Sequence, residues 1–236
     1  MSSTTSESDT FGSSYSWDLS DLDLIFADEF DDIGGGPDPS SWEFNVGPAG
    51  SWYNNEEQGY EDGLDVAQII DVDETANVNG ALRITASNVN GDLTSARVKS
   101  KIEDVGPYGY YEIRAKLPSE QGAWPALWLL GDLEKNTWPL TGEIDIVEWS
   151  SVKHDEVTGN QIMSALHFAD RHGGNPVTEA ATLDSAVDNW HIYQLWWTPD
   201  AIKIGVDGTV RLTHTWSTIS LSIRTSTIGR MTSRWT

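Results

Sequence analysis

The sequence predicts an all-β fold, either a sandwich or a barrel. Its 236 residues contain many short runs of strand-forming residues, and turn pairs such as Gly173-Gly174 and Asp207-Gly208 separate several of them. Within residues 80–87, apolar side chains alternate with polar ones, as along a strand with one buried face. No long stretch repeats apolar residues at a helical spacing. Short strands at similar spacing, without helices, are typical of β-sandwiches and β-barrels.

The expected strands follow one another through the central part of the chain. The first, residues 22–30, is rich in strand-forming residues and is closed by the glycine-rich turn DDIGGGPDP. The run at 80–87 places Leu82 and Ile84 on one face and Arg83 on the other. The other expected strands are residues 97–101, 109–117, 124–130, 142–149, 161–168, 191–198 and 201–208.

Composition divides the chain into three parts. Residues 1–20 are a polar leader of low complexity that we expect to be disordered; it lacks the cationic start and apolar segment of a secretory signal. Residues 21–216 are expected to form one domain. Residues 217–236 are an atypical tail rich in Ser, Thr and Arg. From Thr209 onward there is no acidic residue, whereas no Lys or Arg precedes Arg83.

The overall charge narrows the classes of partner. With 37 acidic and 14 basic residues the net charge is −23, and such a surface repels nucleic acid, anionic membranes and sulfated polymers. Cysteine is absent, which excludes a disulfide framework, a thiol nucleophile and a Cys-ligated metal. No apolar run approaches the about 18 residues of a membrane-spanning helix. We therefore expect a neutral or cationic partner, for which the 12 Trp offer flat apolar faces.

The segment TGEIDIVEWSS concentrates the acidic residues that could do chemistry. Glu143 and Asp145 are two apart and so share a face of a strand, whereas Glu148 falls on the opposite face. A β-bulge within residues 146–147 would add one residue and return Glu148 to their face. Three carboxyl groups so close cannot all ionise at their ordinary pKa, so at least one pKa must rise. Two carboxyls with separated pKa values are what glycosidic bond cleavage uses.

Two other interpretations of this acidic strand stay open from the residues alone. Acidic strand residues are usually a solvated face, although here Ile144, Ile146 and Val147 make the other side apolar and Trp149 follows at once. Carboxylates are also the hard oxygen ligands that Ca²⁺ prefers. The spacing by itself therefore favours a catalytic role without excluding a solvated or a calcium-binding one.

Six segments of the chain carry a family resemblance. In chain order they are SWYNNEEQGY, TSARVKSK, GYYEIRAKLPSEQGAWPALWLL, GEIDIVEW, HFAD and NWHIYQLWWTPDAIKIGVDG. In this order they resemble motifs of family 16 glycoside hydrolases, and GEIDIVEW is similar to the Glu-x-Asp-x-x-Glu form found in laminarinase-type β-1,3-glucanases. The resemblance extends over residues 22–208 and implies a β-jelly roll. Such a fold is a concanavalin A-like sandwich of two antiparallel sheets, with a substrate groove across the concave one.

The resemblance implies a reaction and a role for each carboxyl group. The implied activity is retaining hydrolysis of internal β-1,3 or mixed β-1,3/1,4 glucosidic bonds in a neutral polysaccharide such as laminarin. Glu143 is the implied nucleophile and Glu148 the implied general acid/base, with Asp145 hydrogen-bonded to Glu143. No cofactor is expected. The structural calcium frequent in the family uses an acid on a closing strand that this chain does not show, so no metal site is assigned.

The resemblance also implies a set of sugar-binding residues. Pyranose rings have apolar faces that stack on aromatic side chains, with a few polar anchors. The implied substrate-binding residues are Asn55, Arg97, Trp124, Trp128, Trp138 and His167.

Each of these residues has a plainer interpretation as well. Trp124 and Trp128 could be core residues, whereas Trp138, beside a proline in a loop, is expected to face the surface. His167 could be a satisfied interior histidine, and Arg97 taken alone is more often a surface charge. For the three Trp of the later strands, alternation predicts a division between core and groove: Trp190, Trp196 and Trp197.

The end of the chain departs from the family pattern. After residue 216 neither the family's apolar strand with a Gln or Asn nor its Val-Asp-Tyr closing strand is visible. We therefore expect a sandwich that lacks its last strands and leaves strand edges open.

Two alternative functions are retained, and the remaining expectations concern partners and location. One alternative is a non-catalytic glucan-recognition module of the same fold, although such modules typically lose catalytic carboxylates. The other is a family member that acts on agar or carrageenan, which the charge of −23 disfavours for a sulfated polymer. We expect a monomer whose partner is a β-glucan and that binds neither nucleic acid nor membrane. By resemblance, it would act outside the cell.

Overall fold

The structure is a computed structural model that describes residues 19, 22–72, 80–101, 108–133, 136–150, 161–183, 187, 189–216 and 230–232, the last three as backbone alone. These residues form β-strands and one short 3-10 helix, η1 (Tyr53–Asn55), and no α-helix occurs among them. This confirms the all-β prediction. Within the same residues, no helix is long and apolar enough to cross a membrane.

The strands lie throughout the chain, and eight of the nine runs predicted from sequence each contain one, the exception being residues 22–30. Those of the first half are β1 (Trp42–Phe44), β2 (Gly59–Tyr60), β3 (Ala67–Asp71), β4 (Gly80–Ile84), β5 (Ser87–Val89), β6 (Asp92–Ser95), β7 (Val98–Ser100) and β8 (Gly109–Ala115). Those of the second half are β9 (Ala126–Leu130), β10 (Glu143–Glu148), β11 (Gln161–His167), β12 (Val177–Thr182), β13 (His191–Trp197), β14 (Ala201–Val206), β15 (Thr209–Thr215) and β16 (Arg230–Thr232).

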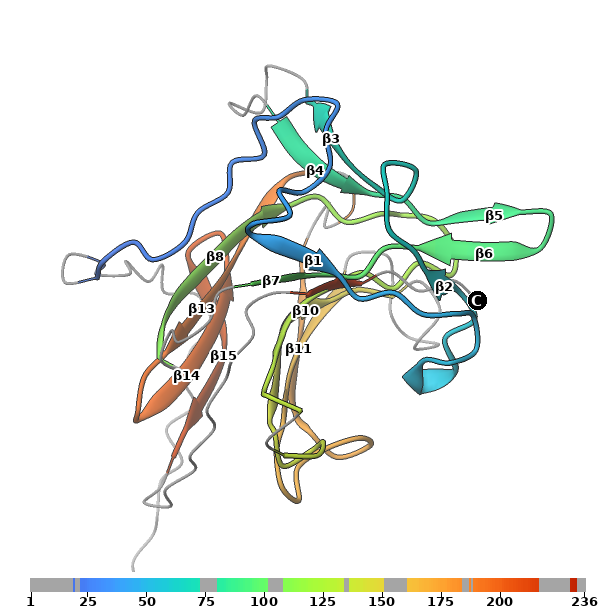
Figure 1. Ribbon diagram of the computed structural model, residues 1–236. Helices are drawn as coiled ribbons and strands as arrows, with labels where there is room; N and C mark the ends of the chain where they lie inside the picture. Colours follow the sequence, from blue (N-terminus) through green and yellow to red (C-terminus); the bar gives the residue numbers. More distant parts are fainter. Residues whose placement is uncertain are drawn as a thin grey trace, which may run out of the picture.

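Two larger antiparallel sheets make up the body of the molecule. The first has seven strands in the order β1-β7-β16-β9-β10-β11-β12, and the second has four in the order β15-β14-β13-β8. Smaller sheets, β2-β6-β5 and β3-β4, extend from one end. In Figure 1 the four-stranded sheet lies beside the seven-stranded one, with β3 and β4 at the top. The two packed sheets form the sandwich that the sequence predicts.

The main core fills the space between the two sheets. Alternate residues of β10 and β13, such as Ile144, Ile146 and Leu195, point into it and are almost completely buried. Because successive side chains point to opposite faces of a strand, the residues between them lie on the face that points away from the core. The seven-stranded sheet therefore turns its other face toward the candidate site.

The first predicted strand, residues 22–30, is not a strand, and this prediction was wrong. Leu24 is 85% exposed and Ile25 is 69% exposed, and only the partly buried Phe30, at the end of the run, packs against a core cluster. Asp28 instead fixes this segment locally: its carboxylate accepts hydrogen bonds from the Phe30 backbone N–H (2.8 Å) and from the Trp42 indole (2.7 Å). Strand propensity alone does not make a strand, because a strand also needs a partner to complete its hydrogen bonds.

The expectation of an open edge near the end of the chain is also corrected. The backbone of β16 pairs antiparallel with β7 on one side and with β9 on the other, so the seven-stranded sheet is continuous at this position. The Ser/Thr/Arg-rich composition of the tail does not prevent this, because ladder hydrogen bonds are made by backbone groups of any residue except proline.

Candidate active site

A break in strand register places the three carboxyl groups of β10 together. Asp145 lies opposite Trp128 of β9 and Ala165 of β11, and the pairing with both neighbours shifts before Glu148. This is the β-bulge that the sequence predicts. Both residues of the bulge, Ile146 and Val147, are buried in the core. The extra residue thereby returns Glu148 to the face that carries Glu143 and Asp145.

Glu143 lies in an environment that strongly perturbs its pKa. Burial, and next the negative charge of Asp145, raise the pKa of Glu143 to about 8. Two neighbours oppose this rise: His167, and the Trp138 indole, which donates a hydrogen bond to Glu143 Oε2 (2.8 Å). Trp138 is 42% exposed, in agreement with the surface position expected for it. The Glu143 carboxyl group therefore keeps its proton at pH values at which an ordinary glutamate has lost it.

Asp145 is the buried centre of the group. It is 3% exposed, and its Oδ2 lies 3.2 Å from His167 Nε2. His167 lies directly opposite Glu143 in the pairing of β10 with β11. Potential ligand atoms of Glu143, Asp145 and His167 all lie within 4.8 Å of one another, so these three side chains are also the ones that could bind a cation.

Glu148 has an indole donor of its own. Trp124 donates from Nε1 to Glu148 Oε1 at 2.9 Å, just as Trp138 donates to Glu143. Trp124 is partly buried and belongs to none of the described core clusters, and its N–H serves the site. Sequence reasoning did not predict that two tryptophans would each bind a different carboxylate.

Arg97 and two aromatic rings form a stack beside the acidic strand. The Arg97 guanidinium lies over the Trp128 ring (4.8 Å to the centroid) and over the Trp52 ring (5.2 Å). Arg97 is 8% exposed and Trp128 9%, so the interpretation of Arg97 as a surface charge is wrong. Burial lowers the pKa of Arg97, and the nearby charges of Glu56 and Glu143 act against this. Trp128 lies opposite Asp145 in the pairing of β9 with β10, so the stack links the acidic strand to the loop that contains Trp52.

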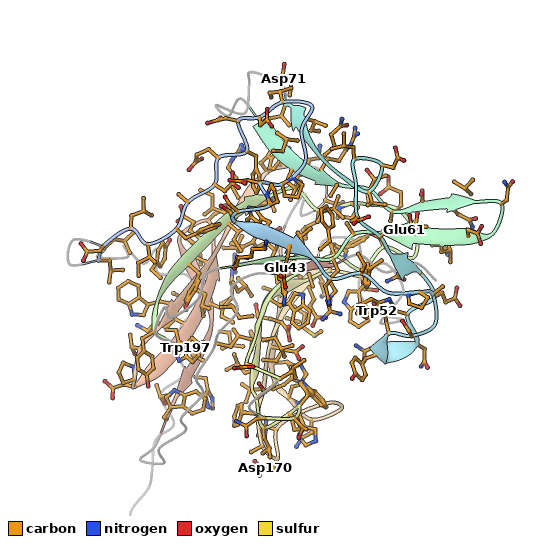
Figure 2. The ribbon with its side chains drawn as sticks, in the orientation of Figure 1. Glu43, Trp52, Glu61, Asp71, Asp170 and Trp197 are labelled. Carbon is orange, nitrogen blue, oxygen red and sulfur yellow. The ribbon has the colours of Figure 1, made fainter. Side chains whose placement is uncertain are left out.

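That loop contains residues that sequence reasoning did not single out. Tyr60 donates a hydrogen bond to Glu56 (2.7 Å) and meets the edge of Trp52 at a centroid distance of 4.9 Å. Gln58 is fully buried and donates to both Glu56 (3.1 Å) and Tyr60 (2.9 Å). Glu56, Gln58 and Tyr60 belong to the segment NNEEQGY, from which the family resemblance implies only Asn55 as a substrate-binding residue. In Figure 2, Trp52 lies near η1, far from Trp197 on β13.

The remaining residues considered from the sequence are Asn55 and the three tryptophans between residues 190 and 197. Asn55 is exposed at the end of η1, with a left-handed backbone (φ 56°). Trp197 is a core residue, as one half of the prediction requires. Trp190 and Trp196 were expected to include groove residues; instead they lie on the outer face of the four-stranded sheet, since Leu195 and Trp197 occupy its inner face.

A two-sheet β-sandwich with three carboxyl groups on one strand is the arrangement of a glycoside hydrolase. Comparison with known proteins gives the particular family: residues 65–227 match the model of glycosyl hydrolases family 16, and the chain belongs to this family.

The relatives include glucanases as well as a keratan-sulfate endo-1,4-beta-galactosidase of Sphingobacterium multivorum. The chain is 36% identical over 194 residues to a beta-glucanase of Rhodothermus marinus, an alignment that covers 78% of this chain and 63% of the relative. It is 31% identical over 186 residues to a glucan endo-1,3-beta-glucosidase of Cryptopygus antarcticus, covering 76% and 66%. The X-ray structure of the laminarinase from Rhodothermus marinus superposes with a TM-score of 0.74 at 28% identity, covering 90% of this chain and 85% of that one. The chain thus spans less than two thirds of the length of these curated relatives.

Proposed function

We propose that this protein is a retaining glycosidase that cleaves internal β-1,3 or mixed β-1,3/1,4 bonds of a neutral β-glucan. The observation that carries the proposal is the set of three carboxyl groups that the bulge in β10 brings to one face. Their environments differ, since Glu143 has a raised pKa whereas Glu148 is held separately by Trp124. Carboxyl groups with different environments can divide the roles of nucleophile and proton donor.

In the proposed first step Glu143 attacks the anomeric carbon while Glu148 gives its proton to the leaving glycosidic oxygen. The C–O bond to the leaving sugar breaks, and a covalent bond to Glu143 forms. Glu143 must be ionised for this attack. Because burial and the charge of Asp145 raise the pKa of Glu143, attack proceeds only from the form in which Glu143 has lost its proton. The Trp138 indole and His167 favour that form by stabilising charge on Glu143.

In the proposed second step Glu148, now a carboxylate, takes a proton from water. The resulting hydroxide attacks the anomeric carbon and displaces Glu143, which regenerates both carboxyl groups. Two displacements at one carbon retain the anomeric configuration. The Trp124 hydrogen bond keeps the Glu148 carboxyl oriented through both steps.

The aromatic residues around the site and the charge of the chain support a neutral glucan as substrate. Trp138 exposes 42% of its surface next to Glu143 and can stack on a sugar face. The net charge of −23 disfavours a sulfated polymer, which ranks agar-type and carrageenan-type substrates lower. The names of the relatives, a beta-glucanase and a glucan endo-1,3-beta-glucosidase, agree with this choice.

A non-catalytic recognition module of the same fold is the second candidate. It is disfavoured because all three carboxyl groups are present, and because Glu143 and Glu148 each retain an indole donor. A module that only binds glucan has no need for a carboxyl group whose pKa is raised to about 8.

We further infer that the protein works outside the cell, as a monomer and without a cofactor. The first two inferences rest on the family relationship, and the last on a reaction that two carboxyl groups complete.

The test is incubation with laminarin and with lichenan, followed by sizing of the products and proton NMR of the first anomer released. The proposal expects short oligosaccharides early in the reaction, with the β-anomer formed first. Initial formation of the α-anomer would reject retention. Binding of either glucan without any release of reducing ends would favour the recognition module.

A further inference from the structure

A second set of aromatic and planar polar side chains lies on the outer face of the four-stranded sheet. The inner-face residues of β13 and β8, such as Leu195 and Ala115, belong to the core, so alternate residues point outward. In the pairing of these strands Trp196 lies opposite Tyr110, and Gln194 opposite Glu112. We call this set the outer aromatic face: Tyr110, Glu112, Arg114, Trp190, Gln194 and Trp196.

Aromatic rings occur at both ends of this face. At one end the rings of Tyr110 and Trp196 lie 6.0 Å apart between centroids, and both are partly exposed. At the other end the Arg114 guanidinium lies over the Trp190 ring at 4.8 Å. Six residues of extended strand separate Trp190 from Trp196, which at about 3.4 Å per residue is about 20 Å. The two ends are therefore far enough apart to contact several units of one extended polymer.

The polar groups between the two ends are held in fixed positions. Gln194 donates to Glu112 Oε2 (3.1 Å) and to the Tyr110 hydroxyl (2.8 Å), and accepts from the Gly208 backbone N–H (2.8 Å). Tyr110 in turn donates to Glu112. Gln194 itself is buried (6% exposed) and serves to hold its neighbours, whereas Glu112 is exposed and presents acceptor positions of its carboxylate to solvent. Side chains already ordered in this way lose little entropy when a ligand binds.

These features exceed what a solvent-facing sheet surface needs. The outer face of a sandwich normally carries polar residues that alternate with the buried ones. A cross-strand aromatic pair can stabilise a sheet, but this accounts for Tyr110 and Trp196 only and leaves the distant Trp190–Arg114 pair unexplained. In Figure 1 no other described strand lies beyond β8, β13, β14 and β15 on the side away from the seven-stranded sheet.

We propose that the outer aromatic face is a second binding site for a neutral β-glucan, on the side of the sandwich opposite the carboxylates. Flat apolar rings separated by ordered hydrogen-bonding groups match a polymer whose sugar rings present apolar faces and hydroxyl edges. The overall charge of −23 disfavours an anionic polymer, while on the face itself the carboxylate of Glu112 is accompanied by the cations of Arg114 and of Lys203, which lies opposite Trp196. This choice of ligand rests on the function proposed above. The site would hold the protein on a long or insoluble glucan while the carboxylate site acts on it.

The test compares variants for binding to insoluble β-1,3-glucan. Trp196→Ala and Trp190→Ala each remove one end of the face, and Trp196→Phe keeps a ring. Thr213→Ala is the matched control, because Thr213 is exposed on β15 of the same sheet and is separated from Trp196 by Lys203 of β14. All are made in a Glu143→Gln background, so that the glucan is not degraded. We expect each Trp→Ala variant to lose about threefold to tenfold in affinity, Trp196→Phe to lose less, and the control to bind like its parent.

A second measurement separates this proposal from the function. With Glu143 intact, Trp196→Ala should hydrolyse a short soluble laminari-oligosaccharide at a rate within twofold of the wild type. Absence of this hydrolysis in the wild type counts against the proposed function alone. Unchanged binding of both Trp→Ala variants to insoluble glucan overturns the second site alone. A dimer that Trp196→Ala converts to a monomer also overturns it, by making this face an interface between copies of the chain.

Discussion

Replacing Trp138 with Phe tests the link between the indole donors and the pKa of the nucleophile. The Trp138 N–H lies 2.8 Å from Glu143 Oε2 and stabilises the ionised carboxylate. Phenylalanine keeps an aromatic ring for stacking but removes the donor. A hydrogen bond to a charged group contributes about 1.5–3 kcal/mol, and because Trp138 is 42% exposed we take about 1 kcal/mol. At 1.36 kcal/mol per pKa unit, the pKa of Glu143 should rise by about 0.7 units in the variant.

The assay is the pH profile of kcat/KM on a soluble laminari-oligosaccharide at constant ionic strength. The acid limb of the wild type should lie well above the ordinary glutamate value of 4.5, since the pKa of Glu143 is raised to about 8. In Trp138→Phe the limb should move up by about 0.7 units, which lowers kcat/KM about fivefold on the acid side and little on the alkaline side.

A control variant in the same loop distinguishes this effect from a disturbed loop. Leu140→Ala changes a side chain that is 65% exposed and should leave the acid limb unmoved. If Trp138→Phe lowers kcat/KM by the same factor at every pH, Trp138 acts by stacking alone and the argument about the hydrogen bond is refuted.

The other predictions concern the carboxyl groups and the end of the chain. Glu143→Gln should abolish turnover yet bind glucan nearly as tightly as the wild type in affinity electrophoresis; more than a few per cent residual activity would reject Glu143 as the nucleophile. Glu148→Ala should form a β-glycosyl azide from azide and a substrate with a good leaving group, and recovery of the α-azide would contradict retention. The raised pKa of Glu143 means that folding stability is lost as pH rises from about 4.5 towards 8, so Glu143→Gln should raise Tm over the wild type at pH 8 but not at pH 4; an equal Tm difference at both pH values would count against this. Truncation after Trp216 removes β16 and leaves one edge of β7 and one edge of β9 unpaired. At about 1 kcal/mol per backbone hydrogen bond this should lower Tm by about 10 °C or more, and an unchanged Tm would show that β16 adds no stability.

The bulge in β10 could be predicted because its sequence breaks the alternation of a strand. Ile144 and Ile146 mark one face as apolar, and Val147 is apolar where a polar residue is expected. Burying both Ile146 and Val147 requires an extra residue in the strand, and this returns Glu148 to the side of Glu143. The placement of Glu143 and Glu148 on one face could thus be predicted from the sequence of this strand alone.

The indole donors could not be predicted in the same way, because they depend on contacts that local patterns do not contain. Trp124 reaches Glu148 across 24 residues of sequence, and Trp138 reaches Glu143 from a loop. Alternation predicts that Trp196 and Trp197 point to opposite faces of the strand. It does not predict that Trp196 lies on the outside of the sandwich and not in the groove. Residues 22–30 have the composition of a strand without being one, since pairing depends on a partner elsewhere in the chain.

The central claim, that Glu143 forms a covalent bond to the sugar, is tested most directly by trapping the intermediate. A 2-deoxy-2-fluoro laminari-oligosaccharide with a good leaving group slows the second step more than the first, so that the glycosyl-enzyme accumulates for mass spectrometry. The account predicts one added glycosyl group per chain, located by peptide mapping on Glu143, and no adduct in Glu143→Gln. A label on Glu148 or Asp145, or turnover without any adduct and with initial release of the α-anomer, would contradict it.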